Sequence, residues 1–157
     1  MLIKRHQKVC LSFISTDLPV WNGIETNATL YQKDCEIFHL LLDRQNLPQS
    51  KSLDRDLKQC DRGLFWLEIS PYRIALTMQS NSRLSYRHFW EKGIYGISRY
   101  CWNTNSNESS KSMRFRNFTK YLKVEQDIYP RHVRIEYELW SDKLQLGSYI
   151  FNLDLDM

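Results

Sequence analysis

Hydrophobic and polar residues alternate with a period of two near the end of the chain, over residues 131–155. The apolar members of the first segment are Val133, Ile135, Tyr137 and Leu139. Between them lie Arg134, Glu136, Glu138 and Trp140. Because successive side chains of a strand point to opposite faces, this pattern indicates a strand with one buried and one wet face. A polar Ser-Asp-Lys turn and a second apolar segment follow, and we predict a β-hairpin whose four apolar residues lie in the core.

Similar short segments occur throughout the chain. We predict further strands at residues 9–14, 24–31, 35–43, 64–70, 72–79, 84–90 and 93–102. Asn22-Gly23 is a strong hairpin-turn signal, and it predicts a reversal between residues 18–21 and the segment 24–31. The polar stretch at about 103–112 predicts a flexible loop.

Two segments favour helices. Ser52 can cap a short helix that runs to Gln59 and ends before Gly63. In the segment 113–126, alternation stops after Phe118, whereas Phe115, Phe118 and Leu122 share one helical face. A strand is the alternative for 113–126, and we favour the helix.

These elements together predict the fold class. Strands do not alternate with helices, so a parallel sheet is not expected. We predict a mainly β protein (β-rich α+β), built as an antiparallel barrel or a strongly curved sheet with one or two short helices. A length of 157 residues fits a single globular domain covering 1–157.

Charge and composition limit the partners and the location. The formal net charge of +4 and the isoelectric point near 8.9 permit an anionic partner without requiring one. No apolar run is long enough for a transmembrane segment, and no signal peptide is recognisable at the N-terminus. We therefore expect an intracellular protein, cytoplasmic or nuclear, unless a leader has been removed. The four cysteines lack metal-type spacing, and we expect reduced, buried thiols; two disulfides in a secreted protein are the alternative.

Enzyme signatures are missing. The sequence contains no phosphate-binding glycine loop, no His-Glu-x-x-His zinc motif and no nucleophile elbow. The histidines are isolated, and His39, inside an apolar run, is interpreted as a hydrogen-bonded core residue. Glu136 and Glu138 are interpreted as members of a solvated strand face with ion pairs. We expect no cofactor and no metal site, and we lean against catalysis.

Basic and aromatic residues occur together between residues 83 and 123. Cations contact phosphates and aromatic faces stack on bases, so this mixture is typical of surfaces that bind nucleic acid. The predicted binding face consists of Arg87, Trp90, Arg99, Arg114, Arg116, Lys120 and Lys123. An ordinary surface above an aromatic core is the competing interpretation.

Three functions are compatible with the sequence. The first is a non-enzymatic binding or assembly protein that docks a protein partner, another copy of itself, or RNA or another polyanion through this basic face. The second is a small barrel that binds an apolar ligand or pigment as a carrier or lyase. The third is an enzyme whose residues are assembled only by the fold.

Overall fold

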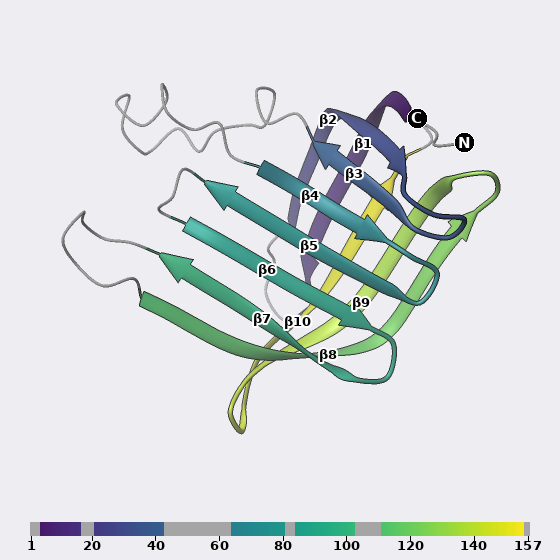
Figure 1. Cartoon of the computed structure of the whole chain (residues 1–157). Coiled ribbons are helices and arrows are strands. Elements are labelled where there is room, and N and C mark those ends of the chain that lie inside the picture. The colour runs from purple at the N-terminus through teal and green to yellow at the C-terminus, as the bar shows by residue number, and fades with distance from the viewer. Residues whose placement is uncertain (1–3, 17–20, 43–63, 81–83, 103–110, 156–157) are drawn as a thin grey trace.

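The chain folds into a closed antiparallel β-barrel in a computed structural model, which describes residues 4–16, 21–42, 64–80, 84–102 and 111–155. The order around the barrel is β1-β10-β9-β8-β7-β6-β5-β4-β3-β2, and β2 returns to β1 (Figure 1). The strands are β1 (Lys4–Ser15), β2 (Trp21–Gln32), β3 (Phe38–Leu42), β4 (Leu64–Ile69), β5 (Arg73–Ser80), β6 (Leu84–Glu91), β7 (Tyr95–Trp102), β8 (Lys111–Gln126), β9 (Pro130–Ser141) and β10 (Leu144–Asp154).

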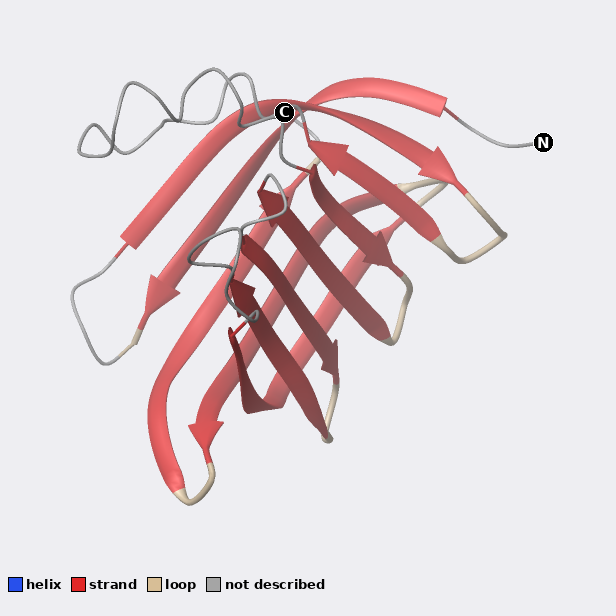
Figure 2. Cartoon of the chain, turned by 60° about the vertical axis from the view of Figure 1, so that its left-hand side comes forward, coloured by secondary structure: helices blue, strands red, loops and turns tan. Residues whose placement is uncertain are grey.

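Each strand pairs with its neighbours in sequence, and the barrel closes where β1 meets β10. In this pairing Cys10 lies opposite Asp154 and Ser15 opposite Tyr149. Closure removes the free edges that an open sheet exposes. The predicted barrel is therefore confirmed. The described residues contain strands and connections but no helix, so the helical part of the prediction is wrong for them (Figure 2).

The segment 113–126 is strand β8 and not a helix. The pairing of β8 with β9 shifts between Thr119 and Tyr121, which marks a β-bulge. An extra residue in one strand reverses which positions face inward. Asn117 and Thr119 are buried before the bulge and Leu122 is buried after it, so the alternation stops where the sequence suggested a helix.

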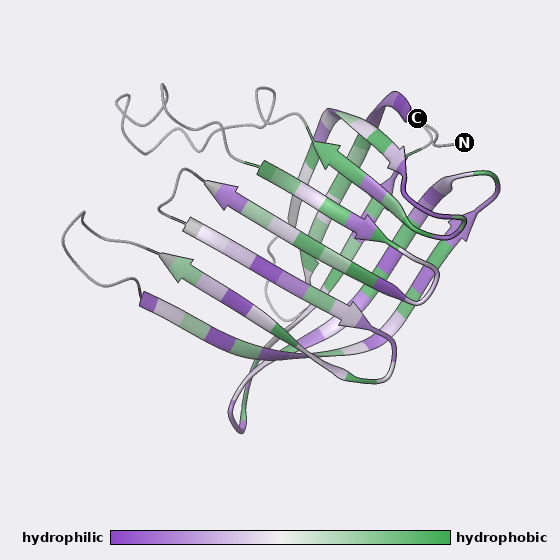
Figure 3. Ribbon diagram, viewed as in Figure 1, coloured by the Kyte–Doolittle hydropathy of each residue, from purple (hydrophilic) through white to green (hydrophobic). Residues whose placement is uncertain are grey.

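The barrel interior is the hydrophobic core, and colouring by hydropathy shows alternating bands along many strands (Figure 3). Its largest fully buried side chains include Trp90, Phe38 and Phe151. The predicted terminal hairpin is β9 and β10, and Val133, Ile135 and Tyr137 are buried as expected. Leu139 is only half-buried.

The predicted turn at Asn22-Gly23 is wrong. Asn22 and Gly23 do not form a turn, because both lie within β2, opposite Phe13 and Ser12 of β1. Pairing along the whole of β1 outweighs the local turn preference of this dipeptide. The predicted helix at 52–59 and most of the loop at about 103–112 lie outside the described residues, whereas Lys111 and Ser112 belong to β8.

Candidate functional site

Three arginines form a row across the outer face of β6, β7 and β8. Arg87 lies directly opposite Arg99, and Arg99 lies directly opposite Arg114. Directly opposed residues of antiparallel strands project from the same face. All three are exposed. Because neighbouring strands lie about 4.8 Å apart, the arginine row (Arg87, Arg99 and Arg114) spans about 10 Å of the barrel wall.

The arginine row lacks acidic partners within the described part of the chain. None of the ion pairs found there involves Arg87, Arg99 or Arg114. Like charges placed directly opposite one another destabilise a sheet. An anion bound across the row would relieve this repulsion, which makes the row a candidate anion-binding surface.

Apolar and aromatic side chains lie beside the arginine row on the same wall. Ile97, two residues before Arg99, is 56% exposed and lies opposite Arg116. Tyr95 is 55% exposed, and its ring centroid lies 4.9 Å from that of Phe118. The guanidinium carbon of Arg116 lies 5.3 Å from the Tyr95 ring centroid. The wall therefore combines exposed ring surface with three arginines that have no acidic partner among the described residues.

The other predicted binding residues have different surroundings. Lys120 Nζ lies 3.7 Å from Glu138 Oε1, and Lys123 Nζ lies 3.5 Å from Glu125 Oε1, so both ammonium groups already have anionic neighbours. Arg116 is exposed, and its guanidinium also donates a hydrogen bond to the carbonyl of Asp142. Trp90 is 0% exposed and stacks on Phe151 inside the barrel, so it does not belong to an outer face.

A polar cluster of His88, Ser98 and Asn117 lies on the inner face of β6, β7 and β8. Asn117 Nδ2 donates to Ser98 Oγ over 2.8 Å, and Ser98 Oγ lies 2.5 Å from His88 Nδ1. All three residues are buried, and burial lowers the pKa of His88 to about 3. A serine beside a histidine can serve as a nucleophile with its base. Here both side chains are almost completely inaccessible to a substrate. The two hydrogen bonds therefore have a structural role, because they link β6 to β7 and β7 to β8 inside the barrel.

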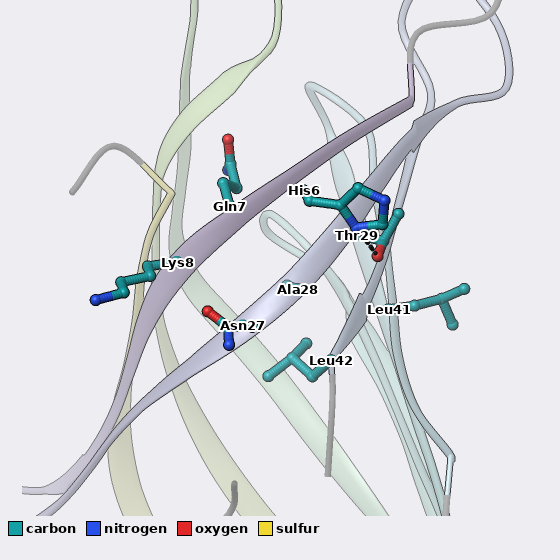
Figure 4. A pocket seen from close by; sticks show the side chains of 8 residues that line it. All are labelled: His6, Gln7, Lys8, Asn27, Ala28, Thr29, Leu41 and Leu42. Atoms are coloured by element: carbon teal, nitrogen blue, oxygen red, sulfur yellow. Dashed lines mark hydrogen bonds between the residues drawn. The ribbon is translucent and has the colours of Figure 1, made fainter. Parts of the chain in front are cut away.

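The wall formed by β1 to β4 carries a second group of surface residues. On its outer side, His6 Nδ1 lies 3.0 Å from Thr29 Oγ1. His6 and Thr29 help to line a hollow of about 520 Å³ that extends to Leu41 and Leu42, whose side chains point in opposite directions (Figure 4). Next to it, Trp66 Nε1 donates a hydrogen bond of 2.8 Å to His39 Nδ1. His39 is thus hydrogen-bonded as predicted, although it lies on the outer wall and not in the core.

The two glutamates and the cysteines singled out in the sequence have contacts or positions that give no sign of a catalytic site among the described residues. Glu136 Oε1 lies 3.3 Å from Arg134 Nη2, and Glu138 is close to Lys120, in agreement with a face of ion pairs. Cys10, Cys35 and Cys101 are free thiols. Cys35 is exposed, so the expectation of burial is wrong for it, and Cys10 and Cys101 are only half-buried. Cys60 lies outside the described residues. Within the described part of the chain, no helix is long and apolar enough to span a bilayer.

Sequence reasoning missed Tyr95 and Ile97 as members of the basic wall. Both could have been found, because they stand four and two residues before Arg99 and so share its side of one strand. It also missed the alignment of Arg87 with Arg99 and Arg114. That alignment depends on the registers between strands, which no local sequence pattern contains.

Comparison with known proteins gives a likeness of fold. No protein family model matches the sequence, and no curated protein is significantly similar to it. Among solved structures, the chain is similar to the ywiB protein from Bacillus subtilis, with a TM-score of 0.59 and 10% identity. The match covers 99% of this chain and 94% of that one. At this identity the likeness extends to the barrel fold alone.

Proposed function

We propose that the chain is a non-enzymatic binding protein that docks single-stranded RNA on the outer wall of β6, β7 and β8. The observation that carries this proposal is the arginine row, in which Arg87, Arg99 and Arg114 stand side by side without an acidic partner among the described residues. A polyanion offers several phosphates in succession, which suits three cations held in a line.

The aromatic neighbours favour single-stranded nucleic acid over a simple anion. Bases of a single strand are free to stack on exposed rings, and such stacking tolerates many sequences. Tyr95 and Phe118 offer ring surface next to Arg116 on the same wall. We therefore expect backbone contacts from the arginine row and stacking contacts from the Tyr95 side, with little preference for sequence.

The test is the binding of a fluorescein-labelled oligouridylate of about 12 nucleotides, followed by fluorescence anisotropy at several salt concentrations. The variant replaces Arg87, Arg99 and Arg114 together with glutamine. For single strands, each phosphate contact contributes about 0.7 to the slope of log affinity against log salt. Losing three contacts should lower the magnitude of the slope by about 2 and weaken binding at low salt by at least about tenfold.

A matched control removes the same charge elsewhere. Arg5, Lys8 and Arg131 are exposed and lie on β1 and at the start of β9, and none of them lies opposite a residue of β6 or β7 or a member of the arginine row. Changing all three to glutamine should leave the salt slope nearly unchanged. Equal losses in the two triple variants would show only a response to net charge and would refute a localised site, as would a wild-type protein that binds no RNA at low salt.

Stability provides a second readout of the same variant. Because opposed like charges destabilise a sheet, the arginine variant should be as stable as the wild type or gain up to about 1 kcal/mol. Lost binding together with unchanged or raised stability would separate a binding role from a structural one. Lost binding together with a lower unfolding midpoint would contradict the assignment.

A further inference from the structure

A groove on the outer wall of β1 to β4 has the features of a small-molecule site, and it is independent of the proposed RNA-binding wall. Its volume is about 640 Å³, within the range of about 300–1,000 Å³ typical of ligand sites. The residues that line this outer groove are Lys4, Tyr31, Gln32, Lys33, His39, Leu41 and Trp66. It adjoins the hollow of Figure 4, since Leu41 lines both.

Strand register places aromatic and aliphatic side chains side by side on the floor of the outer groove. Tyr31 lies opposite His39, and Leu41 lies opposite Trp66 on the next pair of strands. The rings of His39 and Trp66 are stacked, with centroids 5.1 Å apart and planes inclined by 23°. The floor therefore suits a flat apolar body.

The two rings hydrogen-bond to each other, whereas His39 Nε2 has no hydrogen-bond partner among the described residues. The indole N–H of Trp66 is donated to His39 Nδ1, which places the proton of a neutral His39 on Nε2. Nε2 lies 3.7 Å from Glu68 Oε2, and Glu68 Oε1 lies 3.8 Å from Arg73 Nη2. The carboxylate of Glu68 thus lies between His39 and Arg73 at distances longer than a hydrogen bond. The ring faces of Trp66 and His39 that are not used in their stack remain for apolar contact.

Two lysines lie at one end of the outer groove. Lys4 is opposite Tyr31, with Nζ 5.6 Å from the ring centroid, and Lys33 follows the end of β2. Both are exposed, and neither takes part in an ion pair with another described residue. The groove is therefore apolar along its floor near Trp66 and Leu41 and positively charged at the Lys4 end.

We infer that the outer groove binds an amphipathic anion, a small molecule with a flat apolar body and one carboxylate or sulfonate group. The body lies against Trp66 and Leu41, and the anionic group is held between Lys4 and Lys33. An anionic group gains attraction to the two lysines that a purely apolar ligand lacks, so we expect the groove to prefer the amphipathic anion.

Two fluorescent probes of similar shape separate the contributions of body and charge. The anion 8-anilinonaphthalene-1-sulfonate carries a sulfonate, and neutral N-phenyl-1-naphthylamine lacks it. The wild-type protein should bind the sulfonate at least about tenfold more tightly than the neutral probe. Comparable affinities for the two probes, or no binding of the sulfonate, would overturn the inference.

Variants locate the bound probe. Changing Lys4 and Lys33 to glutamine should weaken sulfonate binding by about tenfold and leave the neutral probe within about twofold. Changing Trp66 to leucine should weaken both probes, because the ring surface is lost. The matched control changes Lys92 and Lys143, two exposed lysines in other turns, and it should alter neither affinity.

The arginine-row variant keeps this test separate from the RNA test. Changing Arg87, Arg99 and Arg114 to glutamine should leave sulfonate binding unchanged. If that variant loses the sulfonate while the Lys4 and Lys33 variant retains it, the probe binds at the basic wall and the outer groove is refuted as the site. Failure of RNA binding has no effect on this result.

Discussion

Replacing Gly96 with alanine tests how closely β6 and β7 approach each other beside the polar cluster. A Cβ atom at residue 96 would meet the carbonyl oxygen of Phe89 well inside 3.0 Å, a separation that real Cβ atoms essentially never show. The same Cβ would lie 3.2 Å from Asn117 Oδ1. The obstacle at Phe89 is backbone and cannot rotate away, so a strand must shift.

The expected cost follows from two opposing effects. Overpacking by one methyl group costs about 1–3 kcal/mol, and we expect the upper end because the backbone must move. Alanine also restricts the unfolded chain, which returns about 0.4–1 kcal/mol. We therefore predict that Gly96→Ala lowers the free energy of unfolding by about 2 kcal/mol.

Two other glycines supply matched controls for the same chemical change. Gly93 has a φ of 79°, and a methyl group added there would enter open space. Gly93→Ala should therefore show only the left-handed backbone penalty of about 1–2 kcal/mol. The restriction of the unfolded chain reduces this cost by the same amount as at Gly96. At Gly147 the nearest atom is the hydroxyl of Tyr149, at 2.8 Å. That atom ends a side chain and can yield, so Gly147→Ala should cost less than about 1 kcal/mol.

The assay is equilibrium unfolding in urea, followed by tryptophan fluorescence, with comparison restricted to variants of equal m-value. Gly96→Ala should be the least stable of the three. A cost at Gly96 equal to or below that at Gly93 would refute the close contact between residue 96 and Phe89.

Two further predictions concern the barrel interior. Ile135→Ala should cost about 2–5 kcal/mol in urea unfolding, because a fully buried side chain leaves a cavity; a cost below about 1 kcal/mol would contradict its place in the core. The pKa of His88 is lowered to about 3 by burial, so below pH about 6.5 the unfolded chain binds a proton at this position that the folded chain does not. The contribution of His88 to stability is therefore complete above that pH and is lost as the pH falls toward 3. His88→Gln should reduce the change of unfolding free energy with pH between these limits. NMR of the His88 imidazole should show a neutral ring at pH 5, and a ring that titrates near 6.5 would contradict the burial.

The barrel could be predicted well because, in most strands, every second residue is apolar and faces the barrel interior. The terminal hairpin was identifiable from Val133, Ile135 and Tyr137 alone. The prediction was wrong where two local signals misled. In β8, a bulge and two inward polar residues, Asn117 and Thr119, hid the strand pattern. In β2, a turn-forming dipeptide lies inside a strand because β1 pairs with β2 from Trp21 to Tyr31.

The candidate sites were less predictable than the fold. The sequence identified the arginines but not their alignment, because register between strands depends on pairing over long sequence distances. Trp90 was assigned to the surface because aromatic rings beside arginines are common at binding faces. Its inward position follows from sharing a strand face with His88, two residues earlier, and both are buried.

The pairing of β1 with β10 has a consequence for how the chain folds. Every other pair of neighbouring strands is consecutive in sequence, whereas this one joins residue 10 to residue 154. The loop-closure entropy of such a contact is larger than that of any hairpin in the barrel. Until it forms, β1 and β10 each present an unpaired edge that can pair with another chain. The speed of this one step therefore governs how long the folding chain is open to aggregation.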